Sequence, residues 1–141
     1  MIVFLTIMDN SSHSNILIIG GGCAGITVAS RLHSLKSDLN ISIIEPSEKS
    51  LYQAAWTLVG AGAYDVGSTV KQMSEVMPSY VNWIKSHAVS FIPESNLVKT
   101  LNGDYTYDYL VVCPGLKINF EGISGLKAVS YTHLTLPTTG V

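Results

Sequence analysis

The chain is short of the residues on which several classes of protein depend. Two cysteines among 141 residues, Cys23 and Cys113, are too few for a disulfide framework. The four histidines have no spacing that would let them bind zinc with either cysteine, so we expect no metal site. Eight lysines and arginines are scattered along the chain against ten acidic residues, which argues against binding to nucleic acid.

Long apolar runs are missing as well. The apolar start, MIVFLTIM, is far shorter than the roughly 20 residues of a membrane-spanning helix, and it lacks the basic flank and cleavage pattern of a signal peptide. We interpret residues 1–14 as an unstructured lead-in. The whole chain is 47% hydrophobic and 13% charged, which supplies enough apolar material for the core of one globular domain or of a piece of one.

Residues 15–44 have the pattern of a strand, a helix and a second strand. Residues 16–19 and 41–44 are short apolar runs, typical of strands that are covered on both faces of a parallel sheet. Between them, apolar residues recur at threefold and fourfold spacing over 23–36, which predicts a helix with one buried face. The sequence therefore predicts parallel strands joined by a right-handed helical crossover.

The rest of the chain has weaker patterns. The glycine-rich segment 47–68 has no clean period and predicts irregular structure, and 70–77 predicts a brief helix that Pro78 ends. An antiparallel meander with a hairpin turn at Asn102-Gly103 is predicted from short strands at 81–84, 88–92, 97–101 and 105–107. A last strand at 109–113 is expected to rejoin the parallel sheet beside the first.

The turn between the first strand and the helix carries a glycine motif. The sequence IIGGGCAG gives Gly20-x-Gly22-x-x-Gly25, and an acidic residue, Glu45, follows twenty positions after the last glycine. Gly20 permits a tight turn, Gly22 lets the backbone approach a diphosphate, and Gly25 lets helix and strand pack closely. The sequence thus predicts an α/β fold: a Rossmann-type FAD/NAD(P)-binding βαβ core with an antiparallel β-meander insertion, as an incomplete domain.

The ligand predicted for this motif is a dinucleotide held by backbone. Amides of the first helical turn, at Cys23 and Ala24, are expected to point at its phosphates and to add the positive end of the helix dipole. Glu45 is expected to accept hydrogen bonds from ribose hydroxyls, and its charge disfavours a 2′-phosphate and hence NADP.

NAD and FAD both fit the motif. An NAD domain would usually continue after Glu45 with another helix and strand, whereas this chain has a glycine-rich segment and a meander. The closing YDYLVVCPG has the form of a second nucleotide-contacting strand and turn, with Gly115 close to the cofactor. Both features favour FAD.

Several side chains admit a chemical and a structural interpretation. A helix start favours a thiolate at Cys23, but a bound diphosphate would compete for the same amides, so we interpret Cys23 as a small packing residue. Cys113 is expected to be a small buried hydrophobe at a strand end. An aromatic wall beside a flavin or quinone is one interpretation of Tyr52, Trp56 and Trp83, but burial in the core is favoured.

Four segments carry a resemblance to a known family: GGGCAGITVASRL, EPSEKSLYQAAWTLVGAGA, VNWIKSHAV and YDYLVVCPGLKINFEGISGL. Over residues 15–127 they resemble the opening of a sulfide:quinone oxidoreductase, and the second segment is the most specific. The resemblance implies FAD as the cofactor. It implies FAD contacts from the backbone at Cys23 and Ala24, from Glu45 to the ribose, from Gln53 near the flavin end, and from the backbone at Ala88 to the adenine.

The family also implies an activity for the full-length protein. Its members oxidise sulfide at a redox cysteine pair beside the flavin, and electrons pass through FAD to a membrane quinone. Neither Cys23 nor Cys113 matches that pair, so we assign no catalytic residue and expect this chain by itself to be inactive. Association with a bacterial membrane or the mitochondrial inner membrane is expected through C-terminal elements that this chain lacks.

Two alternatives to this function remain open. One is a type II NADH:quinone oxidoreductase or another FAD/NAD(P)-dependent pyridine nucleotide-disulfide oxidoreductase. The other is a non-catalytic nucleotide-binding fragment.

The domain organisation follows from the resemblance. Residues 15–127 are interpreted as a partial FAD-binding domain. The resemblance stops at Lys127, and residues 128–141, AVSYTHLTLPTTGV, resemble translated adapter sequence and are interpreted as a non-native tail. The alternative is a genuine divergent tail, whose alternating threonine and leucine would pair as an edge strand.

Overall fold

The computed structural model of this protein describes residues 12–117, 119–122 and 124. Strand β1 (His13–Ile19) begins two residues inside the predicted lead-in, and residues 1–11 of that lead-in lie outside the described residues. The interpretation of residues 128–141 as a non-native tail also falls outside them and stays a prediction.

The predicted strand, helix and strand are all present. Helix α1 (Cys23–Leu35) joins β1 to β2 (Ile41–Ile44), and the two strands pair in parallel with Ile16 opposite Ile41. Strand β8 (Gly103–Val112) pairs in parallel with β1 on its other side. The expectation that the last strand rejoins the sheet beside the first is confirmed.

Strand β5 (Val81–Ile84) corrects the predicted topology. It pairs in parallel with β2, with Val81 opposite Ile41, so it belongs to the parallel core and not to the meander. A short helix, α3 (Met73–Val76), and this strand therefore do follow Glu45. The expectation that no helix and strand follow Glu45, which was one of the two reasons to favour FAD over NAD, was therefore wrong. Four residues with buried ends are compatible with either pairing direction, so local pattern did not decide it.

The six-stranded sheet has the order β5-β2-β1-β8-β7-β6. Strands β6 (Ala88–Ile92), β7 (Leu97–Thr100) and β8 form the antiparallel meander. Its hairpin turn is at Leu101 and Asn102, one residue before the predicted Asn102-Gly103, because Gly103 already pairs with Thr100 in β8. Strand β8 runs unbroken where two strands were predicted. Asp108, between the two predicted strands, lies exposed and accepts a hydrogen bond from Asn15 Nδ2 at 2.8 Å.

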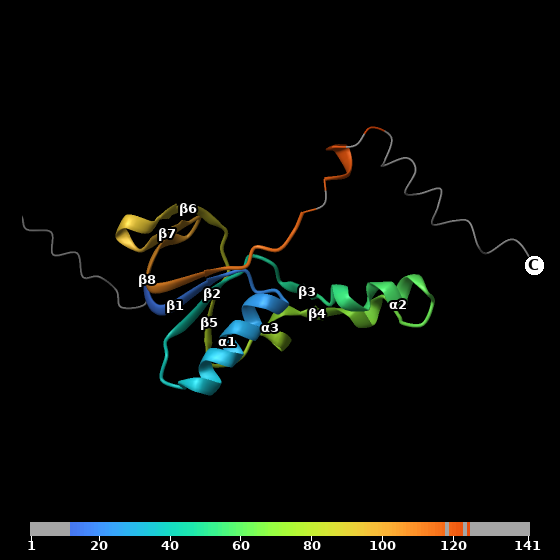
Figure 1. Cartoon of the computed structure of the whole chain (residues 1–141), viewed down its shortest axis with the longest axis horizontal. Coiled ribbons are helices and arrows are strands. Elements are labelled where there is room, and N and C mark those ends of the chain that lie inside the picture. Colours follow the sequence, from blue (N-terminus) through green and yellow to red (C-terminus); the bar gives the residue numbers. More distant parts are fainter. Residues whose placement is uncertain (1–11, 118, 123, 125–141) are drawn as a thin grey trace, which may run out of the picture.

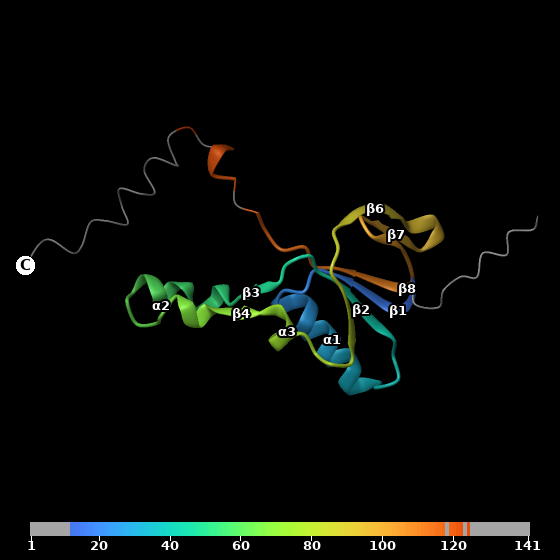
Figure 2. The same cartoon turned by 180° about the vertical axis from the view of Figure 1, so that it is seen from behind.

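Two apolar clusters hold the layers together. Helix α1 covers one face of the sheet, where Ala29 packs with Ile16, Ile18 and Ile43. The meander covers the other face, where Val98 packs with residues of the core strands, including Leu17. Figures 1 and 2 show α1 and the β6–β7 hairpin on opposite sides of the core strands. Leu17 and Ile18 are both fully buried, which confirms a β1 covered on both faces.

Residues 49–72 form an arm that projects from this core (Figure 1). Strands β3 (Lys49–Leu51) and β4 (Val70–Gln72) pair antiparallel at its base, and its outer part holds helix α2 (Trp56–Gly60) and the 3-10 turns Gln53–Ala55 and Gly67–Thr69. The predicted helix over 70–77 is thus half right, since its first three residues are strand. Among the described residues, none of the helices has the length and apolarity needed to cross a bilayer.

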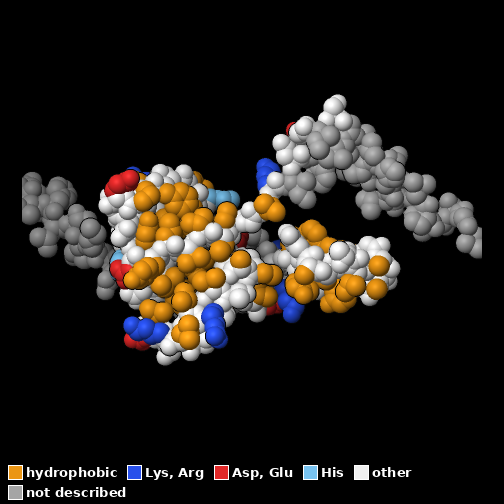
Figure 3. All heavy atoms as spheres, viewed as in Figure 1, with side chains coloured by type: hydrophobic (Ala, Val, Ile, Leu, Met, Phe, Trp, Pro, Cys, Tyr) orange, Lys and Arg blue, Asp and Glu red, His pale blue; other side chains and the backbone are white. Residues whose placement is uncertain are grey.

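The arm is more apolar on its surface than the sequence predicted. Tyr52 is 55% exposed and Trp56 is 43% exposed, so their expected burial in the core was wrong. Trp83, on β5, is half-buried. Figure 3 shows apolar side chains over much of the visible surface of the arm.

Candidate dinucleotide-binding site

The carboxyl ends of the parallel strands meet at one edge of the sheet. There the Gly20 amide donates to the Ile44 carbonyl at 2.9 Å, and the Cys113 amide donates to the Ile19 carbonyl at 2.7 Å. The Glu45 amide donates to the Ile84 carbonyl at 3.0 Å. These bonds bring the glycine turn, Glu45 and the turn after β8 together in the crevice where open α/β sheets bind their ligands.

Packing explains two of the three glycines of the motif. Gly20 has a φ of 101°, and a Cβ built on it would collide with the Cys113 carbonyl oxygen. A Cβ on Gly25 would collide with the Gly20 carbonyl oxygen and would lie 3.2 Å from Ile18 Cγ2. The predicted roles of Gly20 in the turn and of Gly25 in close helix-strand packing agree with this geometry.

Gly22 differs from both, because the protein itself leaves room for a side chain there. It is the N-cap of α1, with φ −75° and ψ −174°, and a Cβ on it would meet nothing within 4 Å. No side chain caps the helix, and its first turn holds no acidic residue. The amides at Cys23 and Ala24 are among the first four of the helix, which have no partner within it. An uncapped helix start beside open space suits an anionic group.

Glu45 faces the glycine turn, as the motif predicted. Its Oε2 accepts a hydrogen bond from the Gly21 amide at 2.8 Å, and its Oε1 accepts one from the Ser47 amide at 2.7 Å. A carboxylate has about four lone-pair sites, so both oxygens keep acceptor capacity for a ribose hydroxyl. The two amides fix the direction in which this carboxylate points.

The sequence did not predict the roles that two residues play at this edge. Gly21 counts as a free position in the motif, yet a Cβ on it would lie 2.8 Å from Glu45 Cγ, so it must be small for the carboxylate to approach. Trp83 Nε1 donates to the Glu45 carbonyl at 2.8 Å and so holds the backbone of the acidic residue. No local signal marks Trp83, because its partner lies 38 positions away.

The other predicted cofactor contacts are spread over separate elements. Gly115, with φ 75°, follows β8 and is exposed, two residues after the Cys113 carbonyl that touches the glycine turn. Gln53 begins the first 3-10 turn of the arm and is exposed. Ala88 begins β6 and is half-buried. Among the residues that the structure describes, no hydrogen bond joins Gln53 or Ala88 to the glycine turn.

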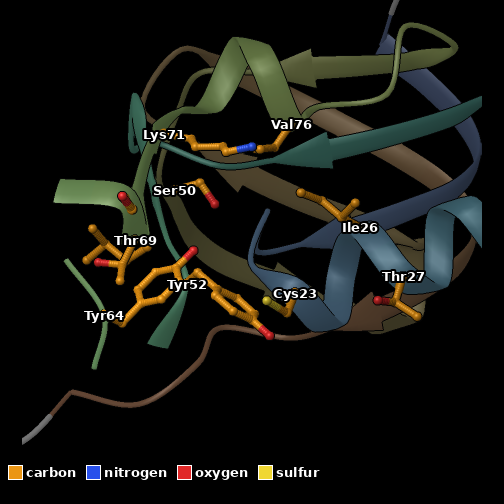
Figure 4. Close-up of a pocket in the computed structure, with 11 residues that line it drawn as sticks. Cys23, Ile26, Thr27, Ser50, Tyr52, Tyr64, Thr69, Lys71 and Val76 are labelled. Carbon is orange, nitrogen blue, oxygen red and sulfur yellow. The ribbon is translucent and has the colours of Figure 1, made fainter. Parts of the chain in front are cut away.

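A pocket of about 420 Å³ lies between α1 and the arm (Figure 4). Cys23, the first residue of α1, lines one side, and Tyr52, the neighbour of Gln53, lines another. The pocket therefore runs from the helix start toward the arm. The remaining lining residues are Ile26, Thr27, Ser50, Leu51, Tyr64, Ser68, Thr69, Lys71 and Val76.

Both cysteines are free thiols in this structure. Cys23 is exposed, so its expected role as a packing residue was wrong. Cys113 is half-buried, less covered than the buried position predicted for it.

Known proteins share this sequence and arrangement. Mitochondrial sulfide:quinone oxidoreductases from Mus musculus and Dictyostelium discoideum are 39% and 42% identical to the chain over 116 residues, which are 82% and 81% of this chain and 26% of each relative. The structure of the sulfide:quinone oxidoreductase from Aquifex aeolicus matches 89% of this chain and 33% of its own, with a TM-score of 0.69 and 25% identity. Type II NADH:quinone oxidoreductase from Staphylococcus aureus is less similar, at 27% identity over 79% of this chain.

The chain spans about a quarter of the length of the mouse and Dictyostelium relatives. A family model described as pyridine nucleotide-disulphide oxidoreductase matches residues 14–139, most of the chain. The chain therefore belongs to the pyridine nucleotide-disulphide oxidoreductase family, whose members are FAD-binding flavoproteins.

Proposed function

We propose that this chain is the FAD-binding N-terminal part of a flavoprotein that oxidises sulfide and passes electrons to a quinone. One observation carries the proposal: an uncapped helix start beside open space at Gly22, with the Glu45 carboxylate held against the same turn. The similarity to sulfide:quinone oxidoreductases supports the substrate and the acceptor.

Each part of the site has a role in this proposal. The amides at Cys23 and Ala24 bind the diphosphate, and Glu45 binds the ribose and repels a 2′-phosphate. Gln53 contacts the flavin end, and the backbone at Ala88 contacts the adenine. The turn at Gly115, with the close-packed turn of Gly20 and Gly25, completes the cradle. Bound FAD supplies two-electron redox chemistry, while these residues bind and orient it.

The sulfide chemistry belongs to residues outside this chain. Neither Cys23 nor Cys113 matches the redox cysteines expected of the family, so the chain contributes binding residues and no catalytic ones. We place the full-length protein at a membrane that contains quinone, attached through C-terminal elements. The mouse and Dictyostelium relatives are mitochondrial and the Aquifex relative is bacterial, so the membrane proposed is the mitochondrial inner membrane or a bacterial membrane. Residues 15–127 are the proposed partial FAD-binding domain.

The binding claim is tested by titrating the purified chain with FAD and following flavin fluorescence, with ADP as a competitor. We expect Glu45→Gln to weaken FAD binding by about 10- to 100-fold, because a lost charge-assisted hydrogen bond costs about 1.5–3 kcal/mol. Glu48→Gln is the matched control, since Glu48 is exposed in the same loop and pairs with Lys85 at 3.3 Å. Equal affinity of Glu45→Gln and wild type would contradict the proposed site.

The activity claim is tested in the full-length protein. We expect sulfide to reduce a quinone analogue through the bound flavin. The match to a type II NADH:quinone oxidoreductase favours a second candidate in which NADH is the donor. A full-length protein that binds FAD and accepts electrons from NADH but not from sulfide would establish that second function instead.

A further inference from the structure

The pocket between α1 and the arm contains a lysine that the proposed function leaves without a role. Lys71 lies on β4 directly opposite Ser50 of β3, so the two side chains share a face, and both line the pocket. Figure 4 shows the Lys71 side chain extending toward Val76, which also lines the pocket. Lys71 is the one charged residue among those that line this pocket.

No carboxylate among the described residues forms an ion pair with Lys71. The ion pairs among the described residues join His13 to Asp108 and Lys85 to Glu48. Asp65, close to the pocket in sequence, accepts hydrogen bonds from the amide and hydroxyl of Ser68 at 2.8 and 3.3 Å. Glu45 is likewise held by backbone amides. Within the described residues, the positive charge of Lys71 is therefore available to a ligand.

The position and lining of the pocket indicate which end of the ligand it receives. One side is Cys23, where the diphosphate is proposed to bind, and another is Tyr52, which precedes Gln53 at the proposed flavin end. Since Glu45 takes the adenosine ribose, the flavin must extend away from it. Tyr52 and Tyr64 give the pocket two exposed aromatic rings, which suit a flat conjugated ring system.

We propose that Lys71 is the residue of this pocket that raises the reduction potential of the bound flavin. The inference rests on the proposed function. Lys71 would stabilise the one negative charge that the ring system of a bound FAD would gain with two electrons and one proton. Lys71 is exposed, so water screens its charge and its effect is moderate.

The test is the midpoint potential of FAD bound to the chain, measured by dye-coupled reductive titration. Lys71→Met is expected to lower the affinity for reduced FAD about tenfold relative to the affinity for oxidised FAD. This change shifts the midpoint potential by about 30 mV in the negative direction for a two-electron couple. Lys71→Arg keeps the charge and is expected to keep the potential. Lys49→Met is the matched control, because Lys49 lies on the same hairpin, next to Ser50, on the other face and outside the pocket lining.

The outcomes separate this inference from the proposed function. A wild-type chain that binds no FAD overturns the proposed function and this inference with it. A chain that binds FAD with the same potential in wild type, Lys71→Met and Lys49→Met overturns the role of Lys71 and leaves the FAD site intact. A shift of the same size in Lys71→Arg also overturns it, because the positive charge would then have no part in the effect.

Discussion

Replacing Gly22 by alanine should leave the stability of the fold almost unchanged and weaken the binding of FAD. A Cβ at this position meets nothing within 4 Å, and φ −75° with ψ −174° is open to alanine. The fold should therefore accept the methyl group. The same methyl group would occupy the space in which a diphosphate must approach the amides of Cys23 and Ala24.

The expected change in stability is small because two effects oppose each other. Alanine is a poorer N-cap than glycine, which costs about 0.5–1 kcal/mol. Alanine also restricts the unfolded chain, which stabilises the native state by about 0.4–1 kcal/mol. The free energy of unfolding should thus change by less than about 1 kcal/mol, a shift of a few degrees in Tm.

The expected change in binding is much larger. Losing two charge-assisted hydrogen bonds from the helix amides to the diphosphate costs about 3–6 kcal/mol, at about 1.5–3 kcal/mol each. FAD affinity should therefore fall by at least about 100-fold. Fluorescence titration measures the affinity, and thermal unfolding without ligand measures the stability.

Gly60→Ala is the control for this experiment. Gly60 ends α2, and a Cβ on it also meets nothing within 4 Å, but it lies outside the proposed cradle. It should leave FAD affinity unchanged. If Gly22→Ala binds FAD within threefold of wild type, the diphosphate does not lie on this helix start and the proposed site is wrong.

Two further substitutions test the packing of helix α1 and of the core strands. Gly25→Ala places a methyl group against the Gly20 carbonyl oxygen, so we expect a loss of more than about 2 kcal/mol in urea unfolding or no folded protein; a loss under 0.5 kcal/mol would contradict the close helix-strand contact. Ser42→Ala removes the buried 2.6 Å hydrogen bond to Ser14 and the 3.3 Å hydrogen bond that Ser42 Oγ accepts from Asn82 Nδ2, and should cost about 1–3 kcal/mol by thermal unfolding. Adding Ser14→Ala should recover part of that loss, whereas strictly additive costs would show that the two hydroxyls do not depend on each other.

The sequence by itself determined the nucleotide-binding unit, because its signals are local and each has one physical cause. Apolar runs at 16–19 and 41–44 fit strands that are buried on both faces, and the spacing over 23–36 fits a helix with one buried stripe. Gly20 and Gly25 stand where a turn and a close helix contact exclude a side chain, and Gly22 stands where the proposed ligand would exclude one. Glu45 follows β2 directly, so its place at the sheet edge comes from the motif.

Tertiary structure decided the features that depend on residues far apart in the chain. The parallel pairing of β5 with β2, the unbroken β8 beside β1, and the approach of Gly21 to Glu45 all depend on partners across the sheet. The arm brings Lys71 and Tyr52 to the start of α1, although nothing in their own neighbourhood of sequence marks a pocket. Strand direction, register and pocket walls are set by contacts between elements, and such contacts have no local pattern.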